Sequence, residues 1–120
     1  AAAYKQGYIT YANEAKHKLL GVKNKTLKKH GAVSRQTAKQ MAKGAAAAAK
    51  ADAAVSVTGI AGPDGGTKEK PVGLVYIGCF VKGKVTVQEC HFSGSRSEIR
   101  QAAAESALVL LRDCILKQLG

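Results

Sequence analysis

The chain has 120 residues, of which 46% are hydrophobic and 22% are charged, so it has the size and composition of one globular domain. No apolar run approaches the length that a transmembrane helix needs, and no secretory leader is recognisable. The three cysteines are widely spaced and form no CxxC pair, which indicates free thiols rather than a redox or zinc motif. We therefore expect a soluble protein in the reducing cytoplasm.

The net charge of +11 indicates a surface that attracts phosphates, whether these belong to nucleic acid or to a small nucleotide. The lysines are spread over several segments, and the only dense group lies at residues 23–29. No aromatic residues alternate with that charge, as stacking on single-stranded nucleic acid would require. A solvated basic surface explains the charge better, so nucleic acid is not an expected partner.

The first half of the chain predicts one strand and three helices. Aromatic and β-branched residues alternate at 7–12, which indicates a strand. Apolar residues then recur at helical spacing, and each helix follows a residue that can cap it. We expect helices at 14–20, 25–30 and 35–50, capped by Asn13, Asn24 and Ser34.

The second half predicts three strands and a long helix. A buried strand at 53–58 ends in a glycine-rich loop, and two further strands form a hairpin about residues 82–84. The hairpin strands are expected at 72–81 and 85–92, and a helix is expected at 96–119 after a capping box from Ser95 to Glu98. A helical crossover followed by a hairpin indicates an α/β fold with a mixed sheet and helices on its faces.

The loop at residues 58–66 is the first candidate for a functional site. A strand that ends in glycines exposes backbone N–H groups at one edge of the sheet, where α/β proteins bind small anions. Thr58 is the hydroxyl at the end of that strand, although a β-branched strand residue whose hydroxyl bonds a nearby carbonyl explains it equally. Glycine and proline also form plain connections, and Asp64 fits a turn better than a catalytic acid.

Two other places could supply chemistry. Lys16 lies in the first turn of a predicted helix, where the helix dipole lowers the pKa of a lysine and suits it as a general base. Tyr11 precedes it at a strand end and could join a proton relay, although a surface lysine beside a core tyrosine is the simpler interpretation. Arg96 begins the last helix, where helix N–H groups and a guanidinium converge on an anion.

Several enzyme classes do not fit the sequence. The histidines His17, His30 and His91 lack metal-ligand spacing, so we expect no metal. No Walker-type lysine follows the glycines, and the loop is not GxGxxG, so neither a nucleoside triphosphatase nor a dinucleotide fold is indicated.

Five segments together carry a resemblance to a known family. They read YANEAK at 11–16, LLGV at 19–22, HGAVS at 30–34, TGIAGPDGG at 58–66 and KPVG at 70–73. In this order they closely resemble the CinA C-terminal domain family, the nicotinamide mononucleotide deamidases, over nearly the whole chain. The resemblance implies one three-layer α/β/α domain over residues 1–120 with a mixed sheet, no cofactor, and a homo-oligomer.

The resemblance also implies an activity and a site. The domain would hydrolyse the carboxamide of nicotinamide mononucleotide to nicotinate mononucleotide and ammonia, in pyridine nucleotide recycling. Lys16 would be the base that activates a serine, assisted by Tyr11, and Arg96 would bind the substrate through its phosphate. Thr58 and the following loop backbone would hold the substrate or the oxyanion, through Gly59, Ile60, Ala61 and Gly62.

One departure from the family affects the expected mechanism. Members have a serine-rich segment of the form AESCTGG before the Tyr–Lys pair, and a serine pair where this chain reads Ala1-Ala2-Ala3. We therefore expect the nucleophilic serine to lie outside this chain, in a missing amino-terminal portion whose strand and helix would leave a sheet edge or apolar face exposed. An inactive member is the alternative. Two other functions stay open: a non-catalytic nucleotide-binding module, or a competence- or DNA-damage-associated module whose DNA binding weakens with salt.

Overall fold

The structure is a computed structural model that describes residues 20–119. The predicted strand at 7–12, and the predicted helix at 14–20 except its last residue, lie outside the described residues. The described elements are α2 (Asn24–His30), α3 (Arg35–Ala49), β1 (Ala53–Gly59), β2 (Leu74–Val81), β3 (Lys84–His91) and α4 (Arg96–Leu119). None of these helices has the length and apolar character required to cross a bilayer.

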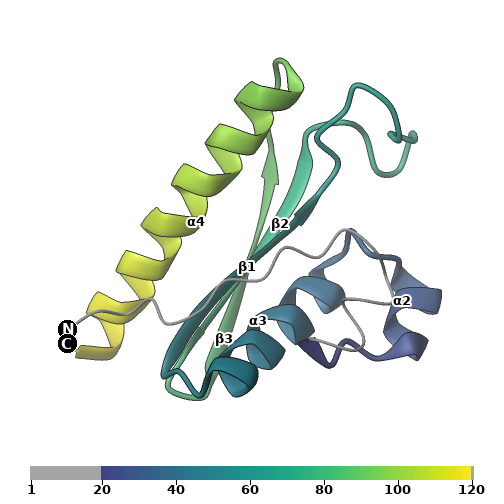
Figure 1. The fold of residues 1–120 in the computed structure, drawn as a ribbon. Helices are drawn as coiled ribbons and strands as arrows, with labels where there is room; N and C mark the ends of the chain where they lie inside the picture. Colours follow the sequence, from purple (N-terminus) through teal and green to yellow (C-terminus); the bar gives the residue numbers. More distant parts are fainter. Residues whose placement is uncertain (1–19, 120) are drawn as a thin grey trace.

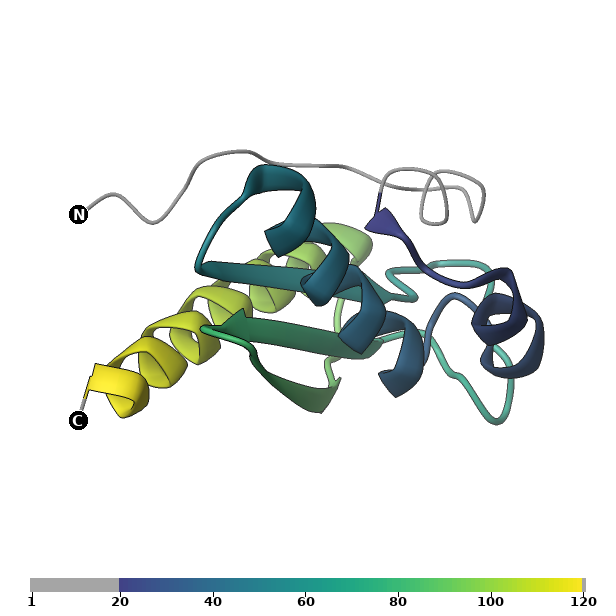
Figure 2. The same cartoon turned by 90° about the horizontal axis from the view of Figure 1, so that it is seen from below.

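The three strands form one sheet in the order β1-β2-β3, with α3 on one face and α4 on the other (Figure 1 and Figure 2). This arrangement confirms the predicted α/β fold with helices on both faces of the sheet. Both strand pairs are antiparallel, so the mixed pairing that we expected is absent among the described strands. The physical reason is that a parallel return needs a crossover, usually helical, whereas β1, β2 and β3 follow each other without an intervening helix.

The hairpin of β2 and β3 is confirmed, with a two-residue turn at its tip. Lys82 and Gly83 form that turn with φ values of 47° and 85°, the left-handed pair that matches the twist of the flanking strands. The hairpin strand begins at Leu74 and not at residue 72 as predicted. Gly73 has a φ of 98°, which lies outside the range of a strand, so regular pairing starts only after it. A Cβ at this position would also lie 1.9 Å from the Phe92 carbonyl oxygen.

Helix α3 lies close to the sheet because the facing residues are small. A Cβ on Gly78 of β2 would lie 2.4 Å from the carbonyl oxygen of Ala38, so only glycine permits this approach. The Ser56 hydroxyl of β1 donates a hydrogen bond of 2.7 Å to the same oxygen. This buried bond fixes α3 against β1 and β2.

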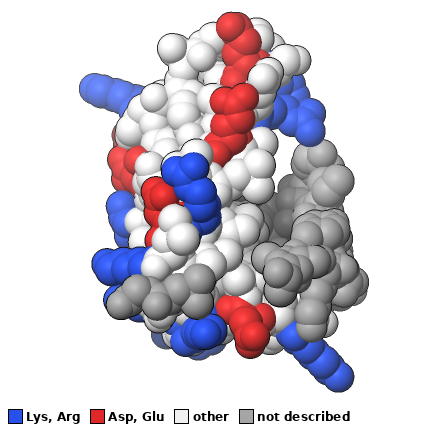
Figure 3. Space-filling model, turned by 90° about the vertical axis from the view of Figure 1, so that its left-hand side faces the viewer, with Lys and Arg blue, Asp and Glu red and all other residues white. Residues whose placement is uncertain are grey.

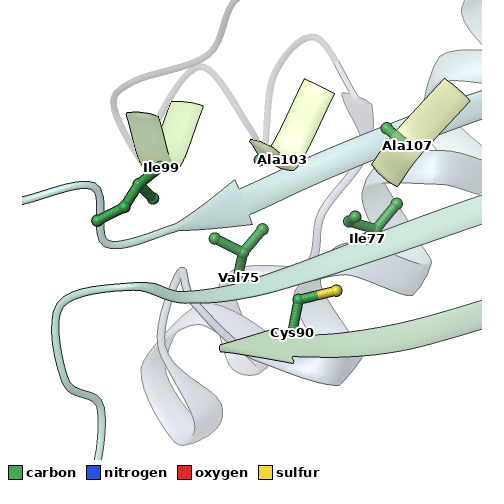
Figure 4. Close-up of a cluster of buried hydrophobic side chains, with 6 residues drawn as sticks. All are labelled: Val75, Ile77, Cys90, Ile99, Ala103 and Ala107. Atoms are coloured by element: carbon green, nitrogen blue, oxygen red, sulfur yellow. The ribbon is translucent and has the colours of Figure 1, made fainter. Parts of the chain in front are cut away.

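Helix α4 covers the opposite face and completes the main hydrophobic core. Figure 4 shows side chains of β2 and β3 directed at a row of residues on α4. The buried cluster comprises Val75, Ile77, Cys90, Ile99, Ala103 and Ala107. The α4 residues recur every four positions, which places them on one helix face. Complete burial of a side chain such as Ile77 contributes about 1.5–3 kcal/mol, so this cluster holds α4 on the sheet.

The predicted helix caps are confirmed at two of the described helices. The Ser34 hydroxyl accepts a hydrogen bond from the Thr37 amide at 3.1 Å, and α3 begins at the next residue. At α4 the Ser95 hydroxyl accepts from the Glu98 amide at 3.2 Å, while the Glu98 carboxylate accepts from the Ser95 amide at 2.8 Å. These reciprocal bonds form the predicted capping box.

The predicted cap of α2 is wrong. Asn24 is the first helical residue, and Lys23 occupies the cap position without a side-chain cap bond. The start of α2 is held instead by α3, because the Gln40 side chain accepts from the Lys23 amide at 2.9 Å and donates to the Thr26 hydroxyl at 2.8 Å. A tertiary contact therefore replaces the local capping that the sequence indicated.

Candidate functional site

A depression of about 450 Å³ lies between the end of β1 and the first turns of α4. Its volume falls in the range of small-molecule sites. Figure 1 shows the loop after β1 and the start of α4 at the same end of the molecule. Its apolar lining comes from Val57, Ala61 and Val75 on the sheet side and from Ala103 and Ala104 on the helix.

Arg96 connects the helix to the glycine-rich loop. Its Nη1 atom donates a hydrogen bond of 3.1 Å to the carbonyl oxygen of Gly62, which lies 34 residues earlier in the chain. Gly62 has a φ of 79°, and a Cβ there would lie 2.6 Å from Cγ1 of Val72, so this turn requires glycine. Gly62 is the only acceptor for Arg96 in the described part of the chain. The other guanidinium N–H groups of Arg96 have no acceptor among the described residues, and they suit an anion.

A second arginine, Arg100, also lines the depression, and the sequence analysis missed it. It lies four residues after Arg96, and this spacing places both side chains on neighbouring positions of the same helix face. That spacing was the signal that could have identified it. Among the described residues that line the depression, two are arginines and none is acidic. The depression therefore combines an apolar wall with two positive charges, which suits a partly apolar anion.

The hydroxyl of Thr58 is directed away from this depression. It donates a hydrogen bond of 2.7 Å to the carbonyl oxygen of Ala32, on the face of the sheet that α3 covers. Side chains alternate along a strand, and the neighbouring Val57 lies on the α4 face among the lining residues. Thr58 therefore faces the depression with its backbone. This is the arrangement that the simpler interpretation of Thr58 anticipated.

The loop backbone offers two N–H groups to a ligand. The Ile60 amide donates to the Leu74 carbonyl at 2.9 Å, so it is already engaged. The amides of Ala61 and Gly62 donate to no acceptor within residues 20–119. These consecutive N–H groups lie beside Arg96 and form the part of the loop that is best suited to bind negative charge.

The far end of the loop is fastened to α2. The Nζ atom of Lys70 donates to the carbonyl oxygen of His30, the last residue of that helix. The Lys70 amide is held within the loop, because it donates a hydrogen bond of 3.0 Å to the Thr67 hydroxyl. Lys70 therefore holds the loop in place and caps a helix C-terminus, where a positive charge is favourable.

Two predicted site residues, Tyr11 and Lys16, lie outside the described residues. The structure brings the remaining ones together, because Thr58, Gly59, Ala61 and Arg96 all line the depression. Ile60 and Gly62 lie in the same loop. Within residues 20–119, no three His, Cys, Asp or Glu side chains gather closely enough to hold a metal ion.

Comparison with known proteins identifies the family. The model of the CinA C-terminal domain matches residues 1–115. The chain belongs to the CinA C-terminal domain family. A Clostridium beijerinckii relative named for competence-damage induction is 54% identical over 112 residues, and a CinA-like protein from Kosmotoga olearia is 53% identical over 113 residues. These matches cover 93% and 94% of this chain.

Solved structures of CinA proteins share the fold. The competence/damage inducible protein CihA from Agrobacterium tumefaciens is 50% identical with a TM-score of 0.84, and the match covers 87% of this chain and 64% of that one. A CinA superfamily protein from Escherichia coli is 35% identical with a TM-score of 0.81, over 85% of this chain and 59% of that one. The chain spans only 27% of the length of the two curated relatives named above.

Proposed function

We propose that this domain is part of an amidase that hydrolyses the carboxamide of nicotinamide mononucleotide. The observation that supports this substrate most directly is the depression at the end of β1, where Arg96 and Arg100 meet an apolar wall. A pyridine mononucleotide has one phosphate and one flat, mostly apolar ring. Its phosphate would bind the arginine pair, and its ring would lie against Val57 and Val75.

In this arrangement the loop amides stabilise the reaction. Attack on the carboxamide carbon produces a tetrahedral intermediate with a negatively charged oxygen. The N–H groups of Ala61 and Gly62 would donate to that oxygen, and a donor pair of this kind lowers the barrier by about 3–4 kcal/mol per donor. Arg96 supports the same geometry, because its bond to the Gly62 carbonyl fixes the peptide that precedes Pro63.

The proposed nucleophile is a serine that is activated by Lys16, with Tyr11 in the proton relay. The serine oxygen would attack the carbonyl carbon while its proton passes to the neutral lysine amine. The lysine then passes this proton to the amide nitrogen as the carbon–nitrogen bond breaks, so that ammonia departs, and water hydrolyses the acyl-enzyme to nicotinate mononucleotide. Neither a metal nor a cofactor is needed for these steps. Thr58 contributes no proton, because its hydroxyl is donated to Ala32.

Ammonia release from nicotinamide mononucleotide by the native polypeptide that carries this domain tests the proposal. Lys16→Ala should remove most of the turnover, and unchanged kcat in that variant would rule out the assigned base. Arg96→Ala should raise KM by about tenfold or more with a smaller change in kcat, since a lost charge-assisted contact costs about 1.5–3 kcal/mol. The matched control is Arg112→Ala, which removes an exposed arginine of the same helix that pairs with Asp113 and should leave KM unchanged.

A non-catalytic nucleotide-binding module is the second candidate. It is favoured by one observation, since Thr58 is the only hydroxyl-bearing residue among the described residues that line the depression, and that hydroxyl is engaged. This candidate predicts that the native polypeptide binds the mononucleotide in calorimetry and releases no ammonia. Turnover that depends on Lys16 would exclude it.

We also propose that the domain functions as a homo-oligomer. The support is a set of exposed apolar side chains on α4, since Leu108, Val109 and Leu116 are 66%, 47% and 59% exposed. Large exposed apolar side chains can become buried at a contact between subunits. Light scattering should give a multiple of the chain mass, and Leu108→Lys should shift it toward the monomer. A monomer mass for the unaltered protein at a high concentration, on the order of 100 µM, would contradict the proposal.

A further inference from the structure

The positive charge of the chain is concentrated in one layer of the fold. Residues 20–51, which include α2 and α3, contain eight basic residues and no acidic residue. Residues 52–119 contain eight basic and seven acidic residues, so that part has a net charge of only +1. Figure 3 shows the α4 side of the molecule, where basic and acidic side chains are interspersed. The α2–α3 layer lies on the opposite side of the sheet (Figure 1).

A groove of about 650 Å³ runs through this basic layer. It lies where the segment before α2 crosses α3, and Gly44 permits the crossing because a Cβ there would meet the Leu20 carbonyl oxygen at 1.5 Å. Three lysines line the groove, namely Lys23 from the crossing segment and Lys39 and Lys43 from α3. Each of the three is exposed.

The cations in the groove are not neutralised within the described part of the chain. None of the three lysines forms an ion pair within residues 20–119. Arg35, one turn before Lys39 on the same stripe of α3, differs in this respect, because it bonds the Val87 carbonyl at 3.1 Å and lies 3.8 Å from the Glu89 carboxylate. The groove therefore presents three positive charges to a ligand, and two glutamines, Gln36 and Gln40, complete its polar lining.

We infer, against the expectation from the sequence alone, that this groove binds the phosphate backbone of a nucleic acid, without reading its sequence. Lysines on two sides of an open groove contact successive phosphates as point charges, and such contacts position a duplex without specifying bases. Aromatic residues are absent from the described lining of the groove, so bases cannot stack there. The binding is weak and electrostatic, and it is separate from the depression on the α4 face.

Fluorescence anisotropy with a labelled 20-base-pair DNA duplex tests this inference at several salt concentrations. The unaltered chain should bind in 50 mM KCl, and the affinity should fall steeply with added salt. In the variant Lys23→Gln/Lys39→Gln/Lys43→Gln the slope of log K against log[salt] should lose about 2.7, since each phosphate contact contributes about 0.9. Affinity at 50 mM KCl should fall by at least tenfold.

The matched control is Lys82→Gln/Lys84→Gln/Lys117→Gln, which removes the same charge from exposed residues outside the groove. It should retain the salt slope of the unaltered chain. Equal losses in both variants would overturn the inference, because they would show a response to net charge alone. Absence of DNA binding at 50 mM KCl, or equally tight binding of poly-glutamate, would also overturn it. Circular dichroism confirms that both variants fold, and the double variant Lys39→Gln/Lys43→Gln replaces the triple variant if it does not.

Discussion

The hydroxyl of Thr58 provides a sharp test of how the end of β1 is held. Thr58 is 6% exposed, and its Oγ1 atom lies 2.7 Å from the Ala32 carbonyl oxygen. Valine has nearly the same shape as threonine, so Thr58→Val removes the hydrogen bond and leaves the Ala32 carbonyl without this donor. An unsatisfied buried group costs about 1–3 kcal/mol. The new methyl adds strain, because a carbon prefers to lie about 3.3 Å or more from an oxygen.

We therefore expect Thr58→Val to lower the free energy of unfolding by about 2 kcal/mol, or about 8 °C in Tm for a domain of this size. Thr58→Ser keeps the hydroxyl and loses one methyl group, which costs about 1 kcal/mol. Urea unfolding of the two variants checks the order, with serine more stable than valine. If packing alone mattered, the β-branched valine would be the more stable variant, and a valine variant as stable as the unaltered protein would refute the reasoning.

Three further predictions concern the sheet, the thiols and the last helix. Gly78→Ala should lower the free energy of unfolding by about 3 kcal/mol or prevent folding, since its Cβ would lie 2.4 Å from the Ala38 carbonyl oxygen, whereas Gly83→Asn at the open hairpin turn should cost little in the same urea titration. Burial, followed by the nearby Cys114 thiol, raises the pKa of Cys79 to about 12, so iodoacetamide at pH 8 should label the partly exposed Cys114 in the folded protein and Cys79 only after unfolding, as mass spectrometry would show. The hydrogen bonds from the Ser95 amide and hydroxyl lower the pKa of Glu98, so its stabilising effect is present above about pH 4.3 and is lost as the pH falls through its folded-state pKa. Thermal melts from pH 6 to 3 should therefore show a smaller loss of stability in Glu98→Gln than in the unaltered protein. Identical pH profiles for the two proteins would contradict this.

Much of the fold could be predicted because local signals and the final structure agree. The capping residues Ser34 and Ser95 fixed where α3 and α4 begin, since their hydroxyls satisfy amides that each helix leaves unpaired. The hairpin followed from a single Lys82-Gly83 turn between apolar runs. The cap of α2 could not be predicted in this way, because Gln40 reaches it from 17 residues away, and a contact of that separation leaves no local signature.

The site was predictable in part for the same reason. The glycines indicated a loop of unusual backbone geometry, and the position of Arg96 at a helix start identified it as a candidate. Sequence could not show that Arg96 reaches the Gly62 carbonyl or that Arg100 joins it, because both depend on how α4 crosses the sheet. Successive side chains of a strand point to opposite faces of the sheet, so the direction of Thr58 depends on which face each helix covers. Only the assembled sheet defines this.

The alternation of side chains along β1 separates the two sites proposed for this chain. Val57 and Thr58 are consecutive residues, yet one lines the depression beneath α4 and the other bonds the segment that leads into α3. The basic groove lies on the α3 side, so the sheet stands between the groove lysines and the arginines of the depression. Sites that share no residues and no hydrogen-bonding partner respond to substitution almost independently. Substitutions of Lys39 and Lys43 should therefore change the binding of a polyanion and leave the KM for a mononucleotide unaltered, whereas loss of Arg96 should do the reverse. A joint response would mean that both sets of cations act on one ligand that extends around the edge of the sheet.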